Sequence, residues 1–146
     1  MLYRPLPWLV LDIDAAVTRA RFTDTDPVGD RIPGAATSVV SAGAQFDKLG
    51  PYFGAIQLRY FGRRPLIEDN SVTSKPTLLL SARAGYRLTE SVEVRLDIFN
   101  LLGSTSHQID YFYASRLAGE PLVGVNDVHF HPVEPTSVRA SIAVKL

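Results

Sequence analysis

The sequence contains no cysteine, carries no net charge and has no long apolar run. Without cysteine, disulfides, thiolate zinc sites and cysteine nucleophiles are excluded. Lys and Arg together number 15, and so do Asp and Glu. The chain therefore lacks the surplus of cations that neutralises phosphates, and nucleic acid is not an expected partner. Because no apolar run approaches the roughly 20 residues that a membrane helix needs, a spanning helix is not expected either.

What the sequence has instead is a period of two in hydrophobicity. In "VEVRLDI" (92–98), every even residue is apolar and every odd residue is charged. This is the period of a β-strand, whose successive side chains point to opposite faces, and no segment keeps a helical period. Alternation of this kind predicts six strands, within residues 8–17, 38–46, 52–62, 77–88, 91–100 and 137–146.

The connections between these strands alternate between short and long. "DKLGP" (47–51) and "RLTES" (87–91) are short, whereas residues 23–36 and 62–76 form long connections. Short turns on one rim, long loops on the other and aromatic girdles are typical of outer-membrane β-barrels. The expected fold is all-β: an antiparallel meander of about six long strands, forming a curved open sheet that is part of a large transmembrane β-barrel. The aromatic residues near strand ends are Trp8, Phe22, Phe46, Tyr52, Tyr60 and Tyr86.

Several segments resemble TonB-dependent outer-membrane receptors. "VEVRLDIFNLLGS" (92–104) resembles the penultimate strand of such a receptor, in which an Asn-Leu pair follows an alternating strand. "YFYASRLAGEP" (111–121), "DVHFHPVEP" (127–135) and "VRASIAVKL" (138–146) resemble the last extracellular loop and the closing strand. "RIPGA" before a strand and "RYFGRRPLIEDN" after one are similar to segments of the same family, so the resemblance covers nearly the whole chain.

The resemblance implies a location and a function. Members of this family are large barrels that enclose a plug domain, and they import siderophores, cobalamin, sugars or other scarce nutrients with energy delivered by TonB. Nothing here resembles the plug, the TonB box or the earlier strands. Residues 1–146 are therefore expected to be the C-terminal portion of such a barrel in the outer membrane of a Gram-negative bacterium.

The same resemblance implies which molecules the chain contacts. The expected partners are outer-membrane lipid, the remainder of the barrel and plug, an unknown small-molecule substrate, and TonB only through the missing N-terminal part. No enzymatic activity and no cofactor are implied. The residues agree, because no Gly-rich phosphate loop, nucleophile elbow or Ser/His/Asp order occurs in the sequence.

Two other classes of protein remain open at this point. A small autonomous outer-membrane barrel with a structural or adhesion role would need closure at about eight strands, and only six are predicted. A soluble β-sandwich binding module would bury the alternating apolar face against a second sheet.

The final hairpin is expected to extend beyond the membrane. If the last strand runs inward, the short turns are periplasmic and the long loops extracellular, and residues 104–135 form one long extracellular excursion. "HQIDYFYAS" (107–115) is then an upward extension of the fifth strand, and residues around 108–116 are expected to pair antiparallel with residues around 127–134.

Charged residues occupy the second face of the predicted strands. Two interpretations are open: they line a solute path or hold the plug, or they pair with one another on a wet barrel wall. Balanced charge favours the second interpretation. The residues expected to face the lumen are Asp12, Asp14, Arg59, Arg83, Glu93, Arg95, Asp97 and Arg139.

Three residues near the end of the chain could form a metal site: His129, His131 and Glu134. Histidine is the commonest metal ligand, and a metal contact at the receptor mouth is one interpretation. The favoured alternative is that "HPVEP" (131–135) shapes the entry to the last strand, because its prolines fix φ and remove donors. A catalytic zinc site would need a further ligand and a dry pocket.

Two loop segments also carry charges that admit a ligand. Cations near the outer rim can pair with lipopolysaccharide phosphates, or they can simply be solvated by water. The cations in question belong to Arg19, Arg21 and "FGRRP" (61–65). "DTDPVGD" (24–30) has acidic oxygens but lacks the ligand spacing of a calcium loop, so a solvated acidic loop is the preferred interpretation.

Overall fold

The computed structural model describes residues 1–23 and 28–145. Part of the predicted acidic loop (24–27) and the last residue of the predicted final strand, Leu146, lie outside the described residues. No described helix is long and apolar enough to cross a membrane. The described residues form nine strands: β1 Leu2–Leu6, β2 Leu9–Val17, β3 Ser38–Leu49, β4 Tyr52–Phe61, β5 Thr77–Arg87, β6 Val92–Phe99, β7 His107–Ser115, β8 Val125–Pro132 and β9 Ser137–Val144.

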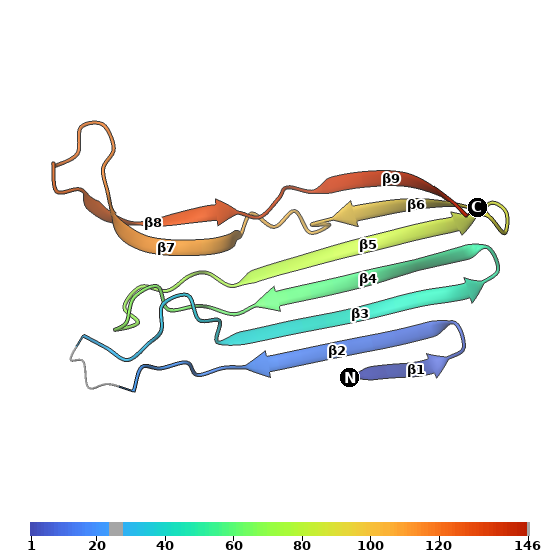
Figure 1. Ribbon diagram of the computed structural model, residues 1–146, viewed down its shortest axis with the longest axis horizontal. Helices are drawn as coiled ribbons and strands as arrows, with labels where there is room; N and C mark the ends of the chain where they lie inside the picture. Colours follow the sequence, from blue (N-terminus) through green and yellow to red (C-terminus); the bar gives the residue numbers. More distant parts are fainter. Residues whose placement is uncertain (24–27, 146) are drawn as a thin grey trace.

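Seven strands form one antiparallel sheet in the order β1-β2-β3-β4-β5-β6-β9, as Figure 1 shows. This confirms the all-β meander. The six predicted strands correspond to β2–β6 and β9, and β1 is an additional short strand that the sequence pattern did not reveal. Its five residues include Pro5, and they are too few and too irregular to display a period of two. Within the described chain, β1 and β9 are the two edges of the sheet.

The short and long connections lie at opposite ends of the sheet. The turns β1–β2, β3–β4 and β5–β6 lie at one end, and the long loops L1 (residues 18–37) and L2 (residues 62–76) lie at the other (Figure 1). Gly50 has φ 62° and Lys48 also adopts a positive φ, which closes the tight β3–β4 turn. The predicted separation of turns and loops is therefore confirmed.

The predicted outer hairpin is also present. Strands β7 and β8 pair antiparallel from His107↔Pro132 to Ser115↔Val125 and project from the loop end of the sheet. They form a separate sheet of two strands, so, contrary to the expectation, residues 107–115 do not continue the fifth predicted strand, β6. They lie beyond the loop end and do not run across the seven-stranded sheet (Figure 1).

Asn100 lies at this break, directly after β6. It adopts φ 49°, and its side-chain amide donates to the carbonyls of Ser104 and Glu134, each at 2.9 Å. Its side-chain oxygen accepts the Ser104 N–H at 2.8 Å. A left-handed residue departs from the extended conformation of a strand, and the Asn100 side chain joins the start of the excursion to its return.

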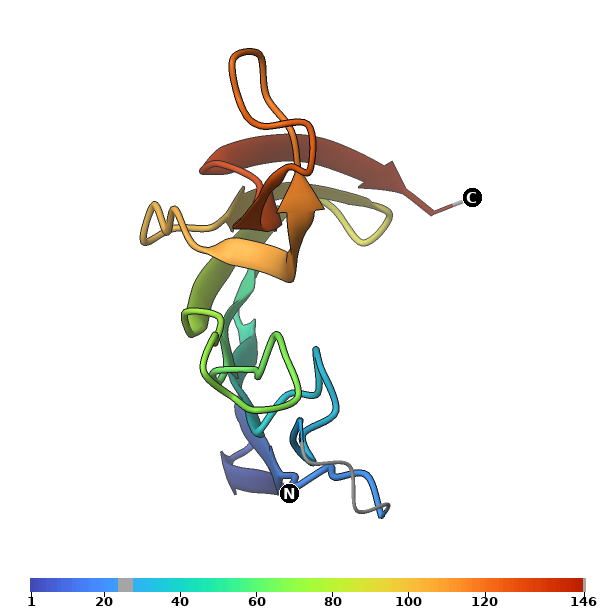
Figure 2. The ribbon, with the colours of Figure 1, turned by 90° about the vertical axis from the view of Figure 1, so that its left-hand side faces the viewer.

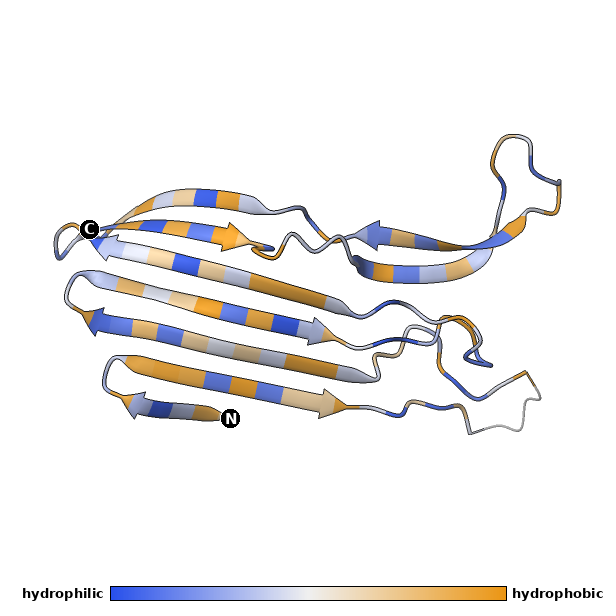
Figure 3. Cartoon of the chain, turned by 180° about the vertical axis from the view of Figure 1, so that it is seen from behind, coloured by the Kyte–Doolittle hydropathy of each residue, from blue (hydrophilic) through white to orange (hydrophobic). Residues whose placement is uncertain are grey.

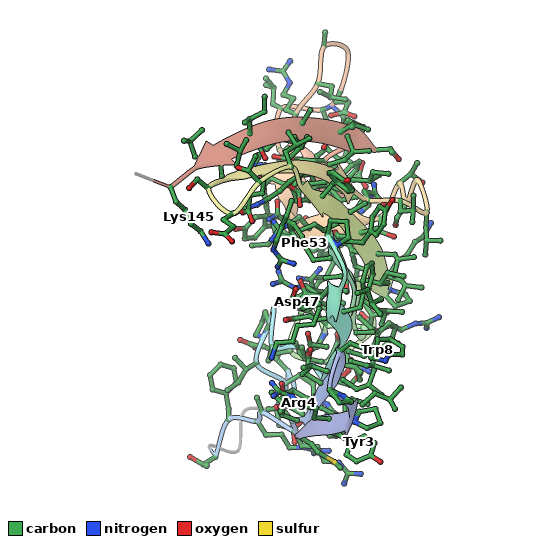
Figure 4. The ribbon with its side chains drawn as sticks, turned by 90° about the vertical axis from the view of Figure 1, so that its right-hand side faces the viewer. Tyr3, Arg4, Trp8, Asp47, Phe53 and Lys145 are labelled. Carbon is green, nitrogen blue, oxygen red and sulfur yellow. The ribbon has the colours of Figure 1, made fainter. Side chains whose placement is uncertain are left out.

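The seven-stranded sheet is curved, as the view along the strands in Figure 2 shows. Its two faces differ, and hydropathy alternates in stripes along β6 and β9 (Figure 3). Figure 4 shows Asp47, Phe53 and Arg4 on the concave side, with Trp8 and Tyr3 on the convex side. The concave side carries the charged residues of the alternating strands together with some apolar ones such as Phe53, and the convex side carries the apolar set.

The convex face has nothing packed against it in the described chain. Ile56 is 51% exposed, Val138 63% and Ile142 71%. The buried hydrophobic residues of the described chain are Leu66 and Val133, and neither belongs to the seven-stranded sheet. An exposed apolar face of this extent marks a surface that another apolar phase or protein must cover.

Candidate functional site

The concave face collects all eight charged residues that the sequence analysis placed together. Residues directly opposite in an antiparallel pair share a face, and the registers run Arg83↔Asp97 and Asp97↔Arg139 across β5, β6 and β9. The same chain of pairs links Asp12 through Gly43 to Gln57 in β4. The predicted set of Asp12, Asp14, Arg59, Arg83, Glu93, Arg95, Asp97 and Arg139 thus lies on one face.

Half of this set is paired internally. Arg83 Nε donates to Asp97 at 2.6 Å, and Arg95 Nε donates to Glu93 at 2.9 Å. Asp14 instead contacts the N-terminal amine at 3.2 Å. Four of the eight residues therefore pair with one another on the wall, as one of the two interpretations predicts.

The remaining residues of the set are differently placed. The Arg139 guanidinium lies 5.2 Å from the centre of the Phe99 ring. Among the described residues, Asp12 and Arg59 make no ion pair or side-chain hydrogen bond. Asp12 borders a hollow of about 220 Å³ on this face, whose wall includes Gly43 and Asp97. The Asp12 carboxylate and the Arg59 guanidinium are thus available to groups outside the described chain.

At the opposite end from the short turns, L1 and L2 are joined by backbone hydrogen bonds. The Arg31 N–H donates to the Glu68 carbonyl at 3.0 Å, and the Gly34 N–H donates to the Pro65 carbonyl at 2.8 Å. Within L2, the Asp69 carboxylate accepts the Ser71 N–H at 2.9 Å, and this hydrogen bond holds the pKa of Asp69 below its usual range. The described residues of the two long loops are therefore joined to each other at the end of the sheet.

A buried ion pair fastens the outer hairpin to this body. Arg64 Nη2 of L2 donates to Asp110 Oδ2 of β7 at 2.9 Å, and the side chains are 14% and 1% exposed. Arg64 Nη1 donates to the Gln108 carbonyl at 3.1 Å. The second oxygen of Asp110 lies 2.5 Å from His107 Nδ1. The carboxylate is therefore occupied on both sides, which satisfies a charge that burial would otherwise penalise.

Between the loops and the hairpin lies a cleft of about 410 Å³. L1 contributes Pro33 and Gly34, and L2 contributes Arg64 and Leu66. Strand β7 contributes its residues 109–113, which include Tyr111, Phe112 and Tyr113. A concave, mostly apolar cleft of this size with a few polar groups is typical of a small-molecule site.

The three residues considered for metal binding each contact different parts of the molecule. His129 stacks on Tyr113, with ring centres 4.0 Å apart, and its buried Nε2 makes no hydrogen bond in the described chain. His131 is exposed and pairs with Ile109 across the hairpin, and the Glu134 backbone carbonyl accepts the Asn100 amide. Among the described residues, no three His, Cys, Asp or Glu side chains are grouped to hold a metal ion.

Two features of this region differ from what the sequence predicts. In a hairpin beyond the membrane, "VHFH" (128–131) would expose both histidines to water, whereas His129 is partly covered by the Tyr113 ring. The sequence does not predict the pair Arg64–Asp110, because its partners are 46 residues apart. The available signal was a single acid, Asp110, within the otherwise aromatic and apolar segment "IDYFY".

Two solved structures share this architecture. The ferric-catecholate import receptor Fiu from E. coli K12 superimposes with a TM-score of 0.74 over 98% of this chain, at 15% sequence identity. The ferric yersiniabactin uptake receptor FyuA from Yersinia pestis superimposes with a TM-score of 0.71 over 99% of it, at 17% identity. The chain has the fold of a TonB-dependent receptor barrel segment.

The chain spans only part of these receptors. It covers 19% of the Fiu chain and 22% of the FyuA chain. No protein-family model matches the sequence, and no curated protein matches it significantly.

Proposed function

We propose that residues 1–146 are the C-terminal portion of the barrel wall of a TonB-dependent receptor in a Gram-negative outer membrane. The whole receptor imports a scarce small-molecule nutrient, and TonB acts on it through parts that this chain does not contain. Outer-membrane lipid covers the convex face, and the remainder of the barrel pairs with the edges of β1 and β9.

The uncovered convex face is the observation that carries this proposal. The six long strands have between 8 and 12 residues. About 9–11 residues per tilted strand are needed to cross a bilayer. Apolar side chains on such strands, with half or more of their surface exposed, are stable when lipid surrounds them and costly when water does.

The two alternative classes fit this architecture less well. An autonomous barrel requires a closed sheet, and the described sheet has two separate edges, β1 and β9. A soluble sandwich requires a second sheet over the apolar face, and the only other described sheet, β7–β8, projects from the loop end.

In this function the concave face lines the lumen and contacts the plug. Asp12 and Arg59 are available to pair with plug side chains, because no described residue neutralises them. The charges of Arg83 and Asp97, and those of Glu93 and Arg95, neutralise each other on the barrel wall. Charged residues turned toward a wet lumen carry little of the penalty they would carry on the lipid face.

Labelling of single cysteines tests the proposed orientation, because the native chain has none. Ser71→Cys in L2 and Ala118→Cys in the hairpin are expected to react with a membrane-impermeant maleimide on intact cells. Glu90→Cys, in the β5–β6 turn, is expected to react only after the outer membrane is permeabilised. All three native residues are exposed, so accessibility within the protein does not distinguish them.

The three variants are made at the natural locus, so that the protein is produced as it occurs. The wild type serves as the labelling blank. Reaction of Glu90→Cys on intact cells at the same rate as Ala118→Cys would refute the orientation. Recovery of all three variants in the soluble fraction would refute the membrane location.

A further inference from the structure

The outer hairpin packs against L2 with one of its two faces. Strand β7 borders the cleft, but the side chains of a strand alternate between its faces. Asp110 lies on the face that contacts L2, because it accepts from Arg64 at 2.9 Å. The opposite face is called the tyrosine face below. It carries Ile109, Tyr111, Tyr113 and Ser115 of β7 and, opposite them, His131, His129, Asp127 and Val125 of β8.

The tyrosine face is apolar in character and about half uncovered in the described chain. Tyr111 is 49% exposed, Tyr113 53% and Val125 44%. Asp127 is its only residue with a formal charge when histidine is neutral, and it carries no Lys, Arg or Glu. Protein interfaces are enriched in aromatic residues and depleted of Lys, Glu and Asp. The composition is therefore that of a surface that contacts protein.

The hairpin also lacks support on this face. A two-stranded hairpin by itself is marginally stable in water, and within the described chain both edges of the β7–β8 sheet are unpaired. At its tip, Leu122 is 86% exposed and Val123 87%. Exposed apolar side chains next to an uncovered aromatic face mark a docking surface for a further polypeptide segment.

The position of the hairpin indicates which segment this is. L2 connects β4 to β5, so the face that contacts L2 is turned toward the middle of the sheet, and the tyrosine face is turned toward the β9 side (Figures 1 and 2). Strand β9 is an edge of the sheet and runs from the hairpin toward the short-turn end. A strand that pairs antiparallel with β9 therefore runs toward the loop end, and the connection that follows it emerges beside the tyrosine face.

We propose that the tyrosine face docks the connection that follows the strand paired with β9, and that this connection contacts it with uncharged aliphatic or aromatic side chains. That strand belongs to the remainder of the barrel, so the inference rests on the function proposed above. The chain covers 19% of Fiu and 22% of FyuA, so receptors of this fold have ample chain outside the described segment to supply the connection. A charged connection fits poorly, because Asp127 alone would be available to pair with it.

Cysteine labelling on intact cells tests the docking in the whole receptor, produced from its natural locus with the wild type as the blank. Tyr111→Cys and Val125→Cys are expected to react with the impermeant maleimide about tenfold more slowly than Ala118→Cys, because the docked segment uncovers them only during local opening. All three native residues are exposed in the described chain, so without docking the three rates should be similar.

A charge placed on the tyrosine face tests the chemistry of the contact. In the Val125→Cys background, Tyr111→Glu is expected to raise the labelling rate to that of Ala118→Cys, because the docked apolar segment would bury an unpaired carboxylate. Asn126→Glu is the matched control. Residue 126 is exposed and lies on the opposite face of the hairpin, so this substitution should leave the rate unchanged.

A photoreactive side chain identifies the occupant. With p-benzoylphenylalanine in place of Tyr111, irradiation of whole cells is expected to cross-link position 111 to a segment of the same receptor outside residues 1–146. Cross-links to a second receptor copy, a different protein or lipopolysaccharide would overturn the inference, and so would protection without any cross-link to that outside chain.

The labelling rates separate this inference from the proposed function. Equal rates at Tyr111→Cys, Val125→Cys and Ala118→Cys on intact cells would overturn the docking and leave the orientation of the receptor standing. Absence of labelling at Ala118→Cys until the outer membrane is permeabilised would refute the orientation, and the docking with it.

Discussion

Replacement of Ile56 by arginine is expected to lower the free energy of unfolding in a bilayer by about 2–4 kcal/mol. Ile56 lies in the middle of β4 on the convex face, opposite Ala44 and Ala82, and is 51% exposed. In the proposed location this exposed surface is covered by lipid, where a guanidinium has no water to solvate it. The effect would be among the largest of any single surface substitution.

Gln57→Arg provides the matched control for this prediction. Gln57 is the next residue of the same strand and points to the concave face, where Asp12 and Ser81 lie in its row. In a wet lumen this substitution is expected to change stability by less than about 0.5 kcal/mol. Urea unfolding in lipid vesicles, followed by the fluorescence of the single Trp8, measures both. Equal destabilisation by both substitutions would contradict the assignment of the two faces.

Replacement of Asp110 by alanine is expected to release the outer hairpin from L2. The change leaves the Arg64 guanidinium, which is 14% exposed, without its carboxylate, and removal of one partner of a buried pair costs about 3–5 kcal/mol. His107 also loses its partner. Because β7 and β8 form a separate sheet, the loss should be local. Hydrogen exchange of the backbone amides of β7 and β8 should become much faster, while exchange in β3–β5 stays unchanged.

The double variant Arg64→Met, Asp110→Leu separates an unpaired charge from the loss of a specific contact. It removes both charges and retains apolar volume, so much of the protection in the hairpin should return. Arg21→Met serves as a control at an ion pair whose side chains are 49% and 42% exposed, where the expected effect is below about 1 kcal/mol. If Asp110→Ala left hairpin exchange unchanged, the ion pair would not be the fastening between hairpin and loops.

The sequence predicted the regular part of this fold because alternation is a local property. Six strands, the two kinds of connection and the single face shared by residues such as Asp12 and Arg139 all follow from a period of two. Strand β1 escaped prediction because five residues with a proline contain too little periodicity. It is held by pairing with β2, an interaction that hydropathy along the chain does not encode.

The loop end was less predictable because its contacts join distant segments. The pairing of β7 with β8 followed from strand-forming residues on either side of a turn region. Its separation from the main sheet depends on Asn100, whose side chain contacts Glu134 across 34 residues. Likewise, the sequence predicts a solvated loop cation at Arg64, whereas the fold places Asp110 beside it. Which charges are buried and paired is decided by this three-dimensional arrangement.

Lipid is expected to cover the convex face of the sheet and water the concave face. Spin labels at single cysteines replacing Ala55, Ile56, Gln57 and Leu58 of β4 test this orientation, with the protein in outer membranes. Collision rates with apolar oxygen are predicted to peak at positions 56 and 58, and those with a polar nickel complex at 55 and 57. Oxygen maxima at 55 and 57, or the absence of a period of two, would contradict the account.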